Sequence, residues 1–351
     1  MRRERTAELR LHQHRTQPLR CDYFLNLQRA KSRYSIYRNK LIVKRNAAST
    51  KRAWVCSRCN VTMKTSKRAK RRPRVIGTPS ALRRAIANFR SRGRTIALVP
   101  TMGALHEGHF SLVRRAQSRA DCVVVSIFVN PTQFAPHEDL NNYPRTFAAD
   151  FAALAERQVA LIWAPSVATM YPDGFAMRVV PGGPATVGLE DASRPHFFAG
   201  LATVVAKLLV QCEPDIALFG EKDYQQLKVV TQLARDLGLK TRIVGAPIVR
   251  ERDGLALSSR NRYLGPAERQ AAPMLYRALK GAAARIGAGA PIAEALKEGC
   301  ETIQRGGLQL DYFEARNADT LERLQSSAGE PIRLLAAARI GTTRLIDNIA
   351  V

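Results

Sequence analysis

The sequence predicts an α/β protein with a parallel sheet, followed by a smaller α+β domain and preceded by a basic tail. Between residues 75 and 248, short apolar runs alternate with amphipathic segments, which is typical of strand–helix–strand units. One run, Cys122–Val129, is almost continuously apolar and rich in β-branched residues, as expected of a strand covered on both faces. After residue 249 the order changes, because two helical segments precede three strand-like segments.

The N-terminal tail differs in composition from the rest of the chain. The chain has 351 residues and a formal net charge of +27, and residues 1–74 contain 23 Lys and Arg against three acidic residues. This part shows no sustained hydrophobic period and includes the basic run Lys67–Arg72, so we expect residues 1–73 to be a largely disordered extension. Three interpretations stay open: an arm that binds nucleic acid or a membrane surface, a targeting peptide, or an extension outside the folded part of the chain. The last is favoured, for example through a start codon placed too far upstream.

The cysteines favour a reducing compartment. Cys122, Cys212 and Cys300 lie in apolar segments without matching spacing, which predicts buried thiols and a cytoplasmic protein. Cys56 and Cys59 form a single C-x-x-C without a second pair at zinc-finger spacing, so a metal site there is disfavoured. No apolar run is long enough to cross a bilayer, so no membrane partner is expected.

The elements of the larger domain follow from apolar spacing and from residues that begin or end helices. Thr78-Pro79-Ser80 precedes helix 81–92, Gly93 ends it, and strand 95–99 follows. The later expected elements are helix 108–119, strand 122–129, helix 150–158 beginning at the capping residue Asp150, strand 160–164, helix 202–210, strand 216–219, a helix ending at Leu237 and strand 242–246. In the smaller domain we expect helices 266–286 and 291–305 and strands 311–316, 332–338 and 344–349.

The turn Pro100–Phe110 follows the first strand and opens into a helix. Such a turn presents backbone N–H groups and a helix N-terminus to an anion, usually a phosphate. Gly103 and Gly108 allow the backbone to approach a ligand closely, and His106 and His109 lie three residues apart at the helix start. Each histidine could donate to phosphoryl oxygens, although two surface histidines on a turn are the simpler alternative.

Two later strand ends carry further anion-binding groups. Lys222 follows a strand within Gly220–Gln226, and Arg260 follows two serines within Gly254–Asn261. A solvated charged helix cap and a self-satisfied turn remain the alternatives for these two segments. Together, three such groups at successive strand ends indicate a nucleoside triphosphate attacked at its α-phosphate. The absence of G-x-x-x-x-G-K-[ST] and of G-x-G-x-x-G after the first strand disfavours a P-loop enzyme and a dinucleotide cofactor.

Two other segments are candidates for contact with substrate. Asn130 and Gln133 follow the second strand and offer groups suited to hydroxyl or carboxylate, although an Asn-Pro turn often only reverses the chain. Pro181–Gly200 is rich in Gly and Pro and is either a mobile flap or an ordinary surface loop.

The motifs together closely resemble the pantothenate synthetase family, also called the pantoate–β-alanine ligases. The segments that carry the resemblance are Pro100–Phe110, Phe128–Phe134, Tyr143–Thr146, Gly220–Gln226, Gly254–Asn261 and Gly341–Asn348. The resemblance covers about residues 75–351 and implies a Rossmann-like nucleotidyltransferase fold of the HIGH superfamily, related to class I aminoacyl-tRNA synthetases. It also implies a homodimer that joins pantoate to β-alanine with ATP and Mg²⁺, releasing AMP and diphosphate by way of an adenylate intermediate.

The resemblance also implies which residues form the site. The catalytic residues would be His109, His106, Lys222 and Arg260. The ATP-binding residues would be Met102, Gly103, His106, His109, Gly220, Glu221, Lys222, Asp223, Val249, Leu257, Ser258, Ser259 and Arg260. Pantoate and β-alanine would meet Gln133, Gln226 and Asn130, while the ligands of Mg²⁺ stay undetermined.

The chain is expected to consist of three parts, and at one place its sequence departs from the usual pattern of the family. We expect an extension over 1–73, a nucleotide- and pantoate-binding domain over 74–248 and an α+β lid over 249–351. Family members usually read Arg-Pro-Gly-His-Phe where this chain has Arg194-Pro195-His196-Phe197-Phe198, which puts the role of that histidine and the shape of the flap in doubt. Alternatives are another adenylyl- or cytidylyltransferase of the superfamily, and a nucleic-acid-binding protein acting through the tail, which is possible but not favoured.

Overall fold

The computed structural model describes residues 53–56, 61–64, 72–135, 140–326 and 329–351. The chain divides into two compact units, residues 1–68 and 69–351, and each is described by itself. In the first unit, strand β1 (Ala53–Cys56) pairs antiparallel with strand β2 (Val61–Lys64). The sequence did not predict this pair. Apart from residues 72 and 73, the rest of the tail expected to be disordered, Cys59 of the C-x-x-C included, lies outside the described residues.

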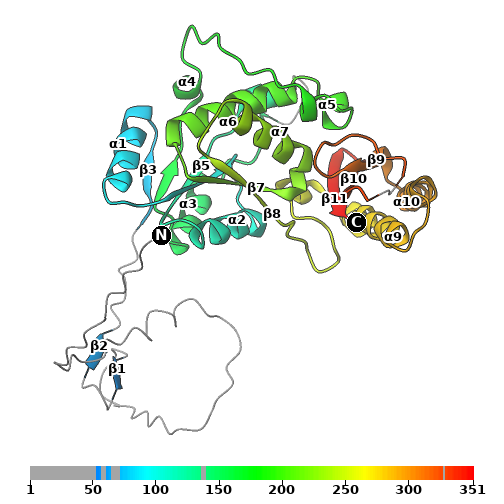
Figure 1. Ribbon diagram of the computed structural model, residues 1–351, viewed down its shortest axis with the longest axis horizontal. Helices are drawn as coiled ribbons and strands as arrows, with labels where there is room; N and C mark the ends of the chain where they lie inside the picture. The colour runs from blue at the N-terminus through cyan, green and yellow to red at the C-terminus, as the bar shows by residue number, and fades with distance from the viewer. Residues whose placement is uncertain (1–52, 57–60, 65–71, 136–139, 327–328) are drawn as a thin grey trace, which may run out of the picture. The chain divides into compact units, whose positions relative to one another are not determined.

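The second unit is built on a six-stranded parallel sheet. Its strands are β3 (Arg74–Ile76), β4 (Ile96–Thr101), β5 (Cys122–Ile127), β6 (Leu161–Trp163), β7 (Ile216–Gly220) and β8 (Arg242–Ala246). They lie in the order β3-β6-β5-β4-β7-β8 (Figure 1). The chain adds β5 and β6 on one side of β4 and then β7 and β8 on the other, so the topology reverses between β4 and β7. Ligands of open α/β sheets bind at the carboxyl edge beside such a reversal.

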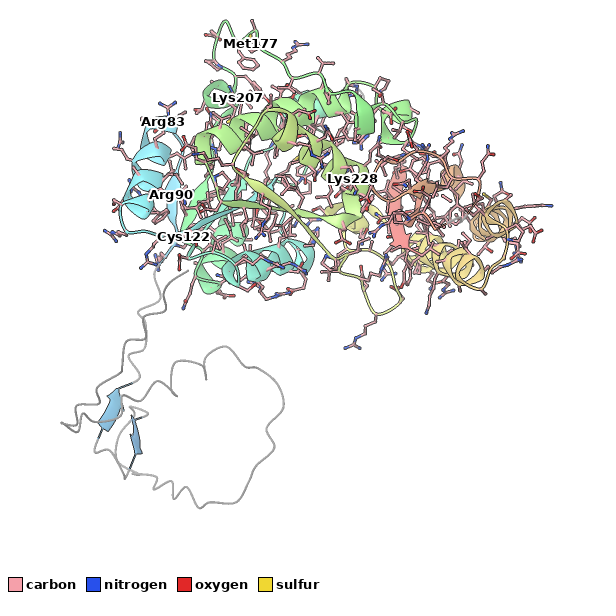
Figure 2. All side chains as sticks on the ribbon, in the orientation of Figure 1. Arg83, Arg90, Cys122, Met177, Lys207 and Lys228 are labelled. Atoms are coloured by element: carbon pink, nitrogen blue, oxygen red, sulfur yellow. The ribbon has the colours of Figure 1, made fainter. Side chains whose placement is uncertain are left out.

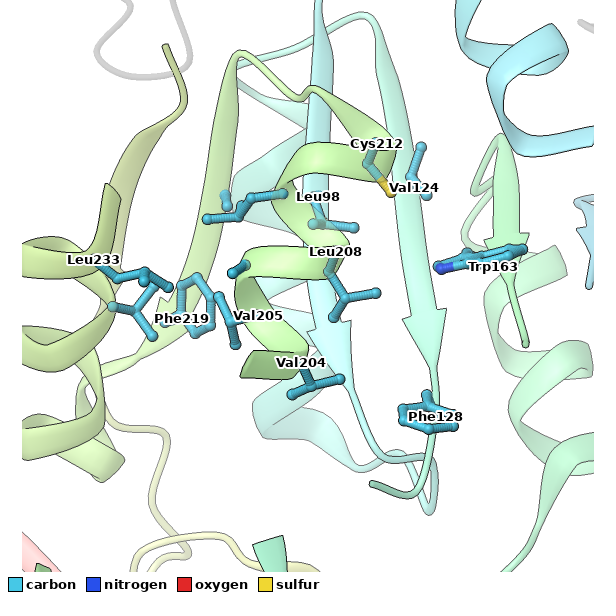
Figure 3. Close-up of a cluster of buried hydrophobic side chains, with 14 of the residues drawn as sticks. Leu98, Val124, Phe128, Trp163, Val204, Val205, Leu208, Cys212, Phe219 and Leu233 are labelled. Atoms are coloured by element: carbon cyan, nitrogen blue, oxygen red, sulfur yellow. The ribbon is translucent and has the colours of Figure 1, made fainter. Parts of the chain in front are cut away.

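Helices cover both faces of this sheet. Helices α1 (Pro79–Arg90), α6 (Phe197–Cys212) and α7 (Tyr224–Asp236) contribute to the core on one face, and α2 (Glu107–Gln117) and α3 (Phe147–Glu156) to the core on the other. Successive side chains of β4 alternate between these cores. Figure 3 shows the first core, in which Leu98 and Val124 of the sheet pack beside Leu208 of α6. The predicted doubly covered parallel sheet is therefore confirmed.

Several elements of this sheet domain differ from the sequence prediction, which did not include the short helices α4 (Val167–Met170) and α5 (Glu190–Ser193). The sequence did not predict β3, a three-residue edge strand with only one buried side chain, because it is too short to show a pattern. Helix α6 begins at Phe197 rather than at residue 202, since Phe198 and Leu201 are buried in the same core as the rest of the helix. Helix α3 begins at Phe147, so Asp150 lies inside its first turn and does not precede the helix.

The C-terminal part forms a second hydrophobic core on a three-stranded antiparallel sheet. Its elements are α8 (Pro266–Ala271), α9 (Met274–Gly287), α10 (Ile292–Arg305), β9 (Gln309–Asn317), β10 (Ile332–Ile340) and β11 (Thr343–Ala350), with strand order β11-β10-β9. Helices α9 and α10 pack on this sheet (Figure 1), which confirms the expected α+β character. The single helix expected over 266–286 is broken before Met274, because Pro273 has no N–H to donate to the preceding turn.

Two general expectations can be compared with the described residues. Cys122 and Cys212 are buried free thiols, as predicted, whereas Cys300, which was also expected to be buried, is a half-buried free thiol. In the part of the chain that the structure describes, none of the helices has the length and apolar character to span a bilayer.

We predict that Gly200→Ala destabilises the protein. A Cβ at Gly200 would lie 2.1 Å from the carbonyl oxygen of Thr132, in the 3-10 turn η2 (Pro131–Gln133) that follows β5. Overpacking of this kind costs about 1–3 kcal/mol, which urea denaturation measures as a lower free energy of unfolding. Gly281→Ala is the matched control, because Gly281 is exposed in α9 with open space around it and should gain about 1 kcal/mol in helix propensity. Equal stabilisation by both substitutions would contradict the close approach of α6 to η2.

Candidate functional site

Two neutral histidines face the carboxyl edge of the sheet at the start of α2. His106 is the N-cap of α2, and its Nδ1 accepts the backbone N–H of Gly108 at 3.2 Å. His109 Nδ1 accepts the backbone N–H of His106 at 3.3 Å, and the two ring centroids lie 4.1 Å apart. Because each Nδ1 is an acceptor, each neutral ring carries its proton on Nε2. Both Nε2–H groups are therefore donors that the turn itself does not use.

Burial and neighbouring charges hold both imidazoles in the neutral form. Burial lowers the pKa of His106 to about 4, and the positive charges of Lys222 and Arg262 contribute to this lowering. Burial lowers the pKa of His109 to about 3, assisted by His106 and Lys222. At neutral pH the pair therefore offers hydrogen bonds to a ligand without adding positive charge.

The two glycines of this turn serve different purposes. A Cβ at Gly108 would lie 2.8 Å from Cε1 of the His106 ring, so glycine leaves the space that the imidazole fills. Gly103 has a φ of 84°, which side-chain-bearing residues adopt only with strain, and the next residue, Ala104, has a φ of 50°. The turn therefore contains two successive residues in the left-handed region.

The carboxylate of Asp150 holds this strained turn. Its Oδ2 accepts the N–H of Ala104 at 3.0 Å and its Oδ1 accepts the N–H of Leu105 at 2.8 Å. Thr146 Oγ1 donates to Oδ2 at 3.1 Å, and Asp150 is almost fully buried. The sequence interpretation of Asp150 as a cap of its own helix missed this contact. The only available signal was an acidic residue in a first helical turn.

Lys222 lies beside the histidines, on the loop after β7. The 3-10 turn η4 (Glu221–Asp223) joins β7 to α7, and Lys222 Nζ lies 3.7 Å from Asp223 Oδ1. The Lys222 charge acts on both histidines, as their lowered pKa values show. Gln226 is half-buried four residues later, in the first turn of α7.

The third loop, after β8, docks against the first. The N–H of Leu257 donates to the carbonyl of Val249 at 2.9 Å, and Ser258 caps the 3-10 turn η5 (Ser259–Tyr263). Ser259 Oγ donates to the carbonyl of Ala104 at 3.2 Å, which joins this loop to the histidine turn. Arg260 is half-buried in η5.

Asn130 and Gln133 form a polar pair after β5, the strand beside β4. Asn130 Nδ2 donates to Gln133 Oε1 at 2.9 Å and to the carbonyl of Gly200 at 3.2 Å. Asn130 Oδ1 accepts from the hydroxyls of Thr132 and Tyr171. Both amide hydrogens of Asn130 are thus used within the protein, and both side chains of the pair are buried.

The structure therefore brings the predicted nucleotide residues to one edge. The residues proposed to contact ATP follow three adjacent strands: Met102, Gly103, His106 and His109 after β4; Gly220, Glu221, Lys222 and Asp223 at and after β7; Val249, Leu257, Ser258, Ser259 and Arg260 after β8. Gly220 is the last residue of β7, and Met102 follows β4 directly.

A buried ionic cluster joins residues 181–200 to the C-terminal sheet. Glu190 Oε2 lies 2.7 Å from both Arg194 Nη2 and Arg344 Nη1, and Glu190 Oε1 accepts from the hydroxyl of Tyr312. Burial alone would raise the pKa of Glu190, but the hydrogen bonds and charges of the two arginines outweigh it and lower the pKa to about 2. The side-chain Oε1 of Gln225 accepts a hydrogen bond from the backbone N–H of Glu190. Sequence reasoning missed this anchor and placed only a loop or a flap there, while His196 is exposed beside it.

We predict that neither site histidine titrates near neutral pH. In ¹⁵N NMR spectra, both should show protonated Nε2 and unprotonated Nδ1 from pH 8 to about pH 5. Between the unfolded-state pKa of about 6.5 and the folded values of about 4 and 3, the unfolded state binds more protons. The free energy of unfolding should therefore fall as pH decreases through that range. A histidine of this pair that titrates near pH 6.5 in the folded protein would contradict the proposed environment.

Comparison with known proteins identifies the family. The sequence profile of the family described as Pantoate-beta-alanine ligase matches residues 74–350. A pantothenate synthetase 2 from Bradyrhizobium diazoefficiens is 62% identical over 281 residues, which cover 80% of this chain and 99% of that protein. A pantothenate synthetase from Rhodopseudomonas palustris is 61% identical over the same shares.

Solved structures agree with the sequence comparison. The crystal structure of pantothenate synthetase from Thermus thermophilus has 47% sequence identity and a TM-score of 0.74, over 79% of this chain and 98% of that one. The pantoate-β-alanine ligase from Francisella tularensis, complexed with beta-gamma ATP and β-alanine, has 35% identity and a TM-score of 0.66, over 79% and 97%. The chain therefore belongs to the pantoate–β-alanine ligase family.

Proposed function

We propose that the chain, as a member of this family, joins pantoate to β-alanine with ATP in two steps through a pantoyl adenylate. A carboxylate oxygen of pantoate attacks the α-phosphorus of ATP, and the bond from that phosphorus to the bridging oxygen breaks to release diphosphate. The amine of β-alanine then attacks the acyl carbon, loses a proton, and AMP leaves. The convergence of three anion-binding loops after β4, β7 and β8 is the observation that supports this function.

Two of the residues proposed to face the phosphates would donate hydrogen bonds, and two others would supply positive charge. His106 and His109 would donate from Nε2–H to phosphoryl oxygens, because both Nδ1 atoms are occupied by backbone N–H groups. Lys222 and Arg260 would offset the charge of the departing diphosphate. Little covalent chemistry is left to the protein, so the positions of these donors must account for the rate.

The pantoate pocket would follow β5. Since both amide hydrogens of Asn130 are used inside the protein, we assign to Asn130 the task of orienting Gln133. The Nε2 group of Gln133 would then hold pantoate and lie near β-alanine, with Gln226 of α7 on the opposite side of β4. Burial of the adenylate between these groups would exclude water and prevent its hydrolysis.

Mg²⁺ would enter with the triphosphate. Among the described residues, no group of three or more His, Cys, Asp or Glu side chains is arranged to hold a metal ion. Mg²⁺ commonly uses one or two carboxylates together with substrate phosphates, and Asp223, half exposed beside Lys222, fits that single-carboxylate role. The ion would neutralise phosphate charge.

We also propose that residues 249–351 act as a lid. A cavity of about 20 Å³ lies between Lys222, Ser258 and Asp347, which is room for one water molecule rather than a nucleotide. This cavity is not lined by His106, His109 or Arg260. Movement of the C-terminal domain on ATP entry is therefore proposed from the position of the linker Leu257–Arg260 before that domain. The homodimer and the cytoplasmic location are proposed from the family resemblance alone.

The experiment that tests the function is pantoate-dependent exchange of labelled diphosphate into ATP. We predict exchange without β-alanine, because the adenylate forms before the amine reacts, whereas another nucleotidyltransferase of this fold would not need pantoate. Lys222→Met should lower the exchange rate by about 10²–10³-fold, as removal of one preorganised charge-stabilising group does.

Lys228→Met is the matched control for Lys222→Met. Both side chains are 20% exposed, but Lys228 pairs with Asp319 of the C-terminal domain, and Figure 2 shows it on α7 next to that domain. Its substitution should leave exchange within about twofold of the parent. Exchange that persists in Lys222→Met, or that proceeds without pantoate, would reject the proposed roles.

The tail gives the remaining test. We predict that deletion of residues 1–73 leaves the ligase turnover unchanged, because the family match begins at residue 74. A nucleic-acid-binding protein would instead lose salt-dependent RNA or DNA binding on deletion, since the first 74 residues carry 23 basic side chains. Turnover measurements and filter binding on the full-length and shortened proteins distinguish the two. Loss of turnover on deletion would contradict the assignment of the tail outside the enzyme.

A further inference from the structure

The last strand of the chain reaches the loop that carries Lys222. Asn348 of β11 is buried, and its side-chain Nδ2 donates to the carbonyl of Glu221 at 2.9 Å and to the carbonyl of Lys222 at 2.9 Å. These two carbonyls belong to the peptide groups on either side of the Lys222 Cα. Clamping both peptide groups fixes the two backbone torsions of Lys222 and therefore the direction in which its side chain leaves the chain.

The orientation of the Asn348 amide is itself fixed by its neighbours. Its Oδ1 accepts from Arg333 Nε at 2.7 Å, so the NH₂ group must be the end that faces the two carbonyls. Arg333 also pairs with the Glu221 carboxylate at 3.4 Å, which adds a second tie to the same turn. Only an amide satisfies two acceptors on one side and a guanidinium donor on the other.

The residue before Asn348 ties the same strand to the third phosphate loop. The Asp347 carboxylate forms a bidentate pair with Arg250, which directly follows Val249, and it also accepts the Asn348 N–H at 2.7 Å. Arg250 Nη2 in turn donates to the Asn348 carbonyl at 3.2 Å. Each backbone and side-chain polar group of Asn348 therefore forms a hydrogen bond within the protein.

We propose that Asn348 is a positioning residue for Lys222, and that the C-terminal domain sets the direction of this catalytic lysine through it. This inference rests on the phosphate-stabilising role proposed for Lys222. Lys222 must lie at the right distance from the departing diphosphate, and a displacement of about 1 Å can cost about a hundredfold in rate. A turn that joins a strand to a helix without such a clamp would let the lysine adopt several directions.

The test is Asn348→Asp, which keeps the shape of the side chain but replaces the donor by an oxygen facing two carbonyl oxygens. We expect the rate of diphosphate exchange at saturating ATP to fall about tenfold to hundredfold, with the KM for pantoate unchanged. Asn348→Ala serves as the second variant, and thermal denaturation confirms that each variant is folded. Turnover at the parent rate in either folded variant would overturn the proposal.

Asn317→Asp is the matched control. Asn317 is also a buried asparagine of the C-terminal sheet, but its Oδ1 accepts the N–H groups of Asp319 and Thr320 and its Nδ2 donates to Glu330, rather than to the carbonyls of the Lys222 turn. It should lower stability without lowering kcat. An equal loss of kcat in both variants would mean a general structural effect and would reject a specific role of Asn348.

A double-mutant cycle separates this proposal from the function on which it rests. If Asn348 acts through Lys222, then Asn348→Asp in the Lys222→Met background should change the rate by less than about twofold. A rate equal to the product of the two separate losses would show independent action and reject the proposal. Normal exchange in Lys222→Met alone would instead reject the role of Lys222, which is a different failure.

Discussion

The carboxylate of Asp150 is the constraint on which the site depends. It binds two consecutive backbone N–H groups, those of Ala104 and Leu105, and these contacts hold Gly103 and Ala104 in the left-handed region. A left-handed non-glycine residue costs about 1–2 kcal/mol, which charge-assisted hydrogen bonds to a buried carboxylate offset. With the turn fixed in this way, His106 caps α2, which begins at Glu107, and the neighbouring loop can dock through Ser259. The geometry of both histidines follows from it.

Buried ions, together with a small apolar cluster of Leu189, Leu321 and Leu335, connect the C-terminal sheet to the edge that carries the candidate site. Arg344 meets Glu190, and Arg250 meets Asp347, with the acidic partner of each pair almost fully buried. Pairs of this kind add little net stability compared with apolar packing, yet losing one partner costs about 3–5 kcal/mol. They therefore favour the arrangement of the two parts seen in this structure, and the proposed lid movement would have to break the Arg344–Glu190 pair. Residues around Glu190 are held by this arrangement, which a sequence rich in Gly and Pro does not reveal.

Sequence alone predicted the elements with strong periodicity and the residues inside compact motifs. Cys122–Val129 indicated a doubly covered strand because both of its faces are apolar, and the histidine turn was recognisable because its glycines and histidines are close together in the chain. Asp150 and Glu190 could not be found in this way, since each acts on a partner more than 40 residues distant in sequence. Asn348 was noticed only as part of a family motif. Its function became visible once β11 was placed beside the Lys222 turn.

The low pKa values of the histidines make physical sense in a site that is proposed to release diphosphate. The tilted rings of His106 and His109 have centroids 4.1 Å apart and lie near Lys222, so protonating either ring would place like charges together in a buried space. Hydrogen bonds from the neutral Nε2–H groups become stronger as negative charge develops on the phosphate oxygens in the transition state. Additional fixed cations would stabilise the bound substrate as much as the transition state, and the reaction rate would not increase. In the proposed reaction, the permanent charges that face the departing diphosphate are therefore those of Lys222 and Arg260 rather than those of protonated histidines. The direction of one of these, set by Asn348, then decides how much of its charge reaches the leaving group.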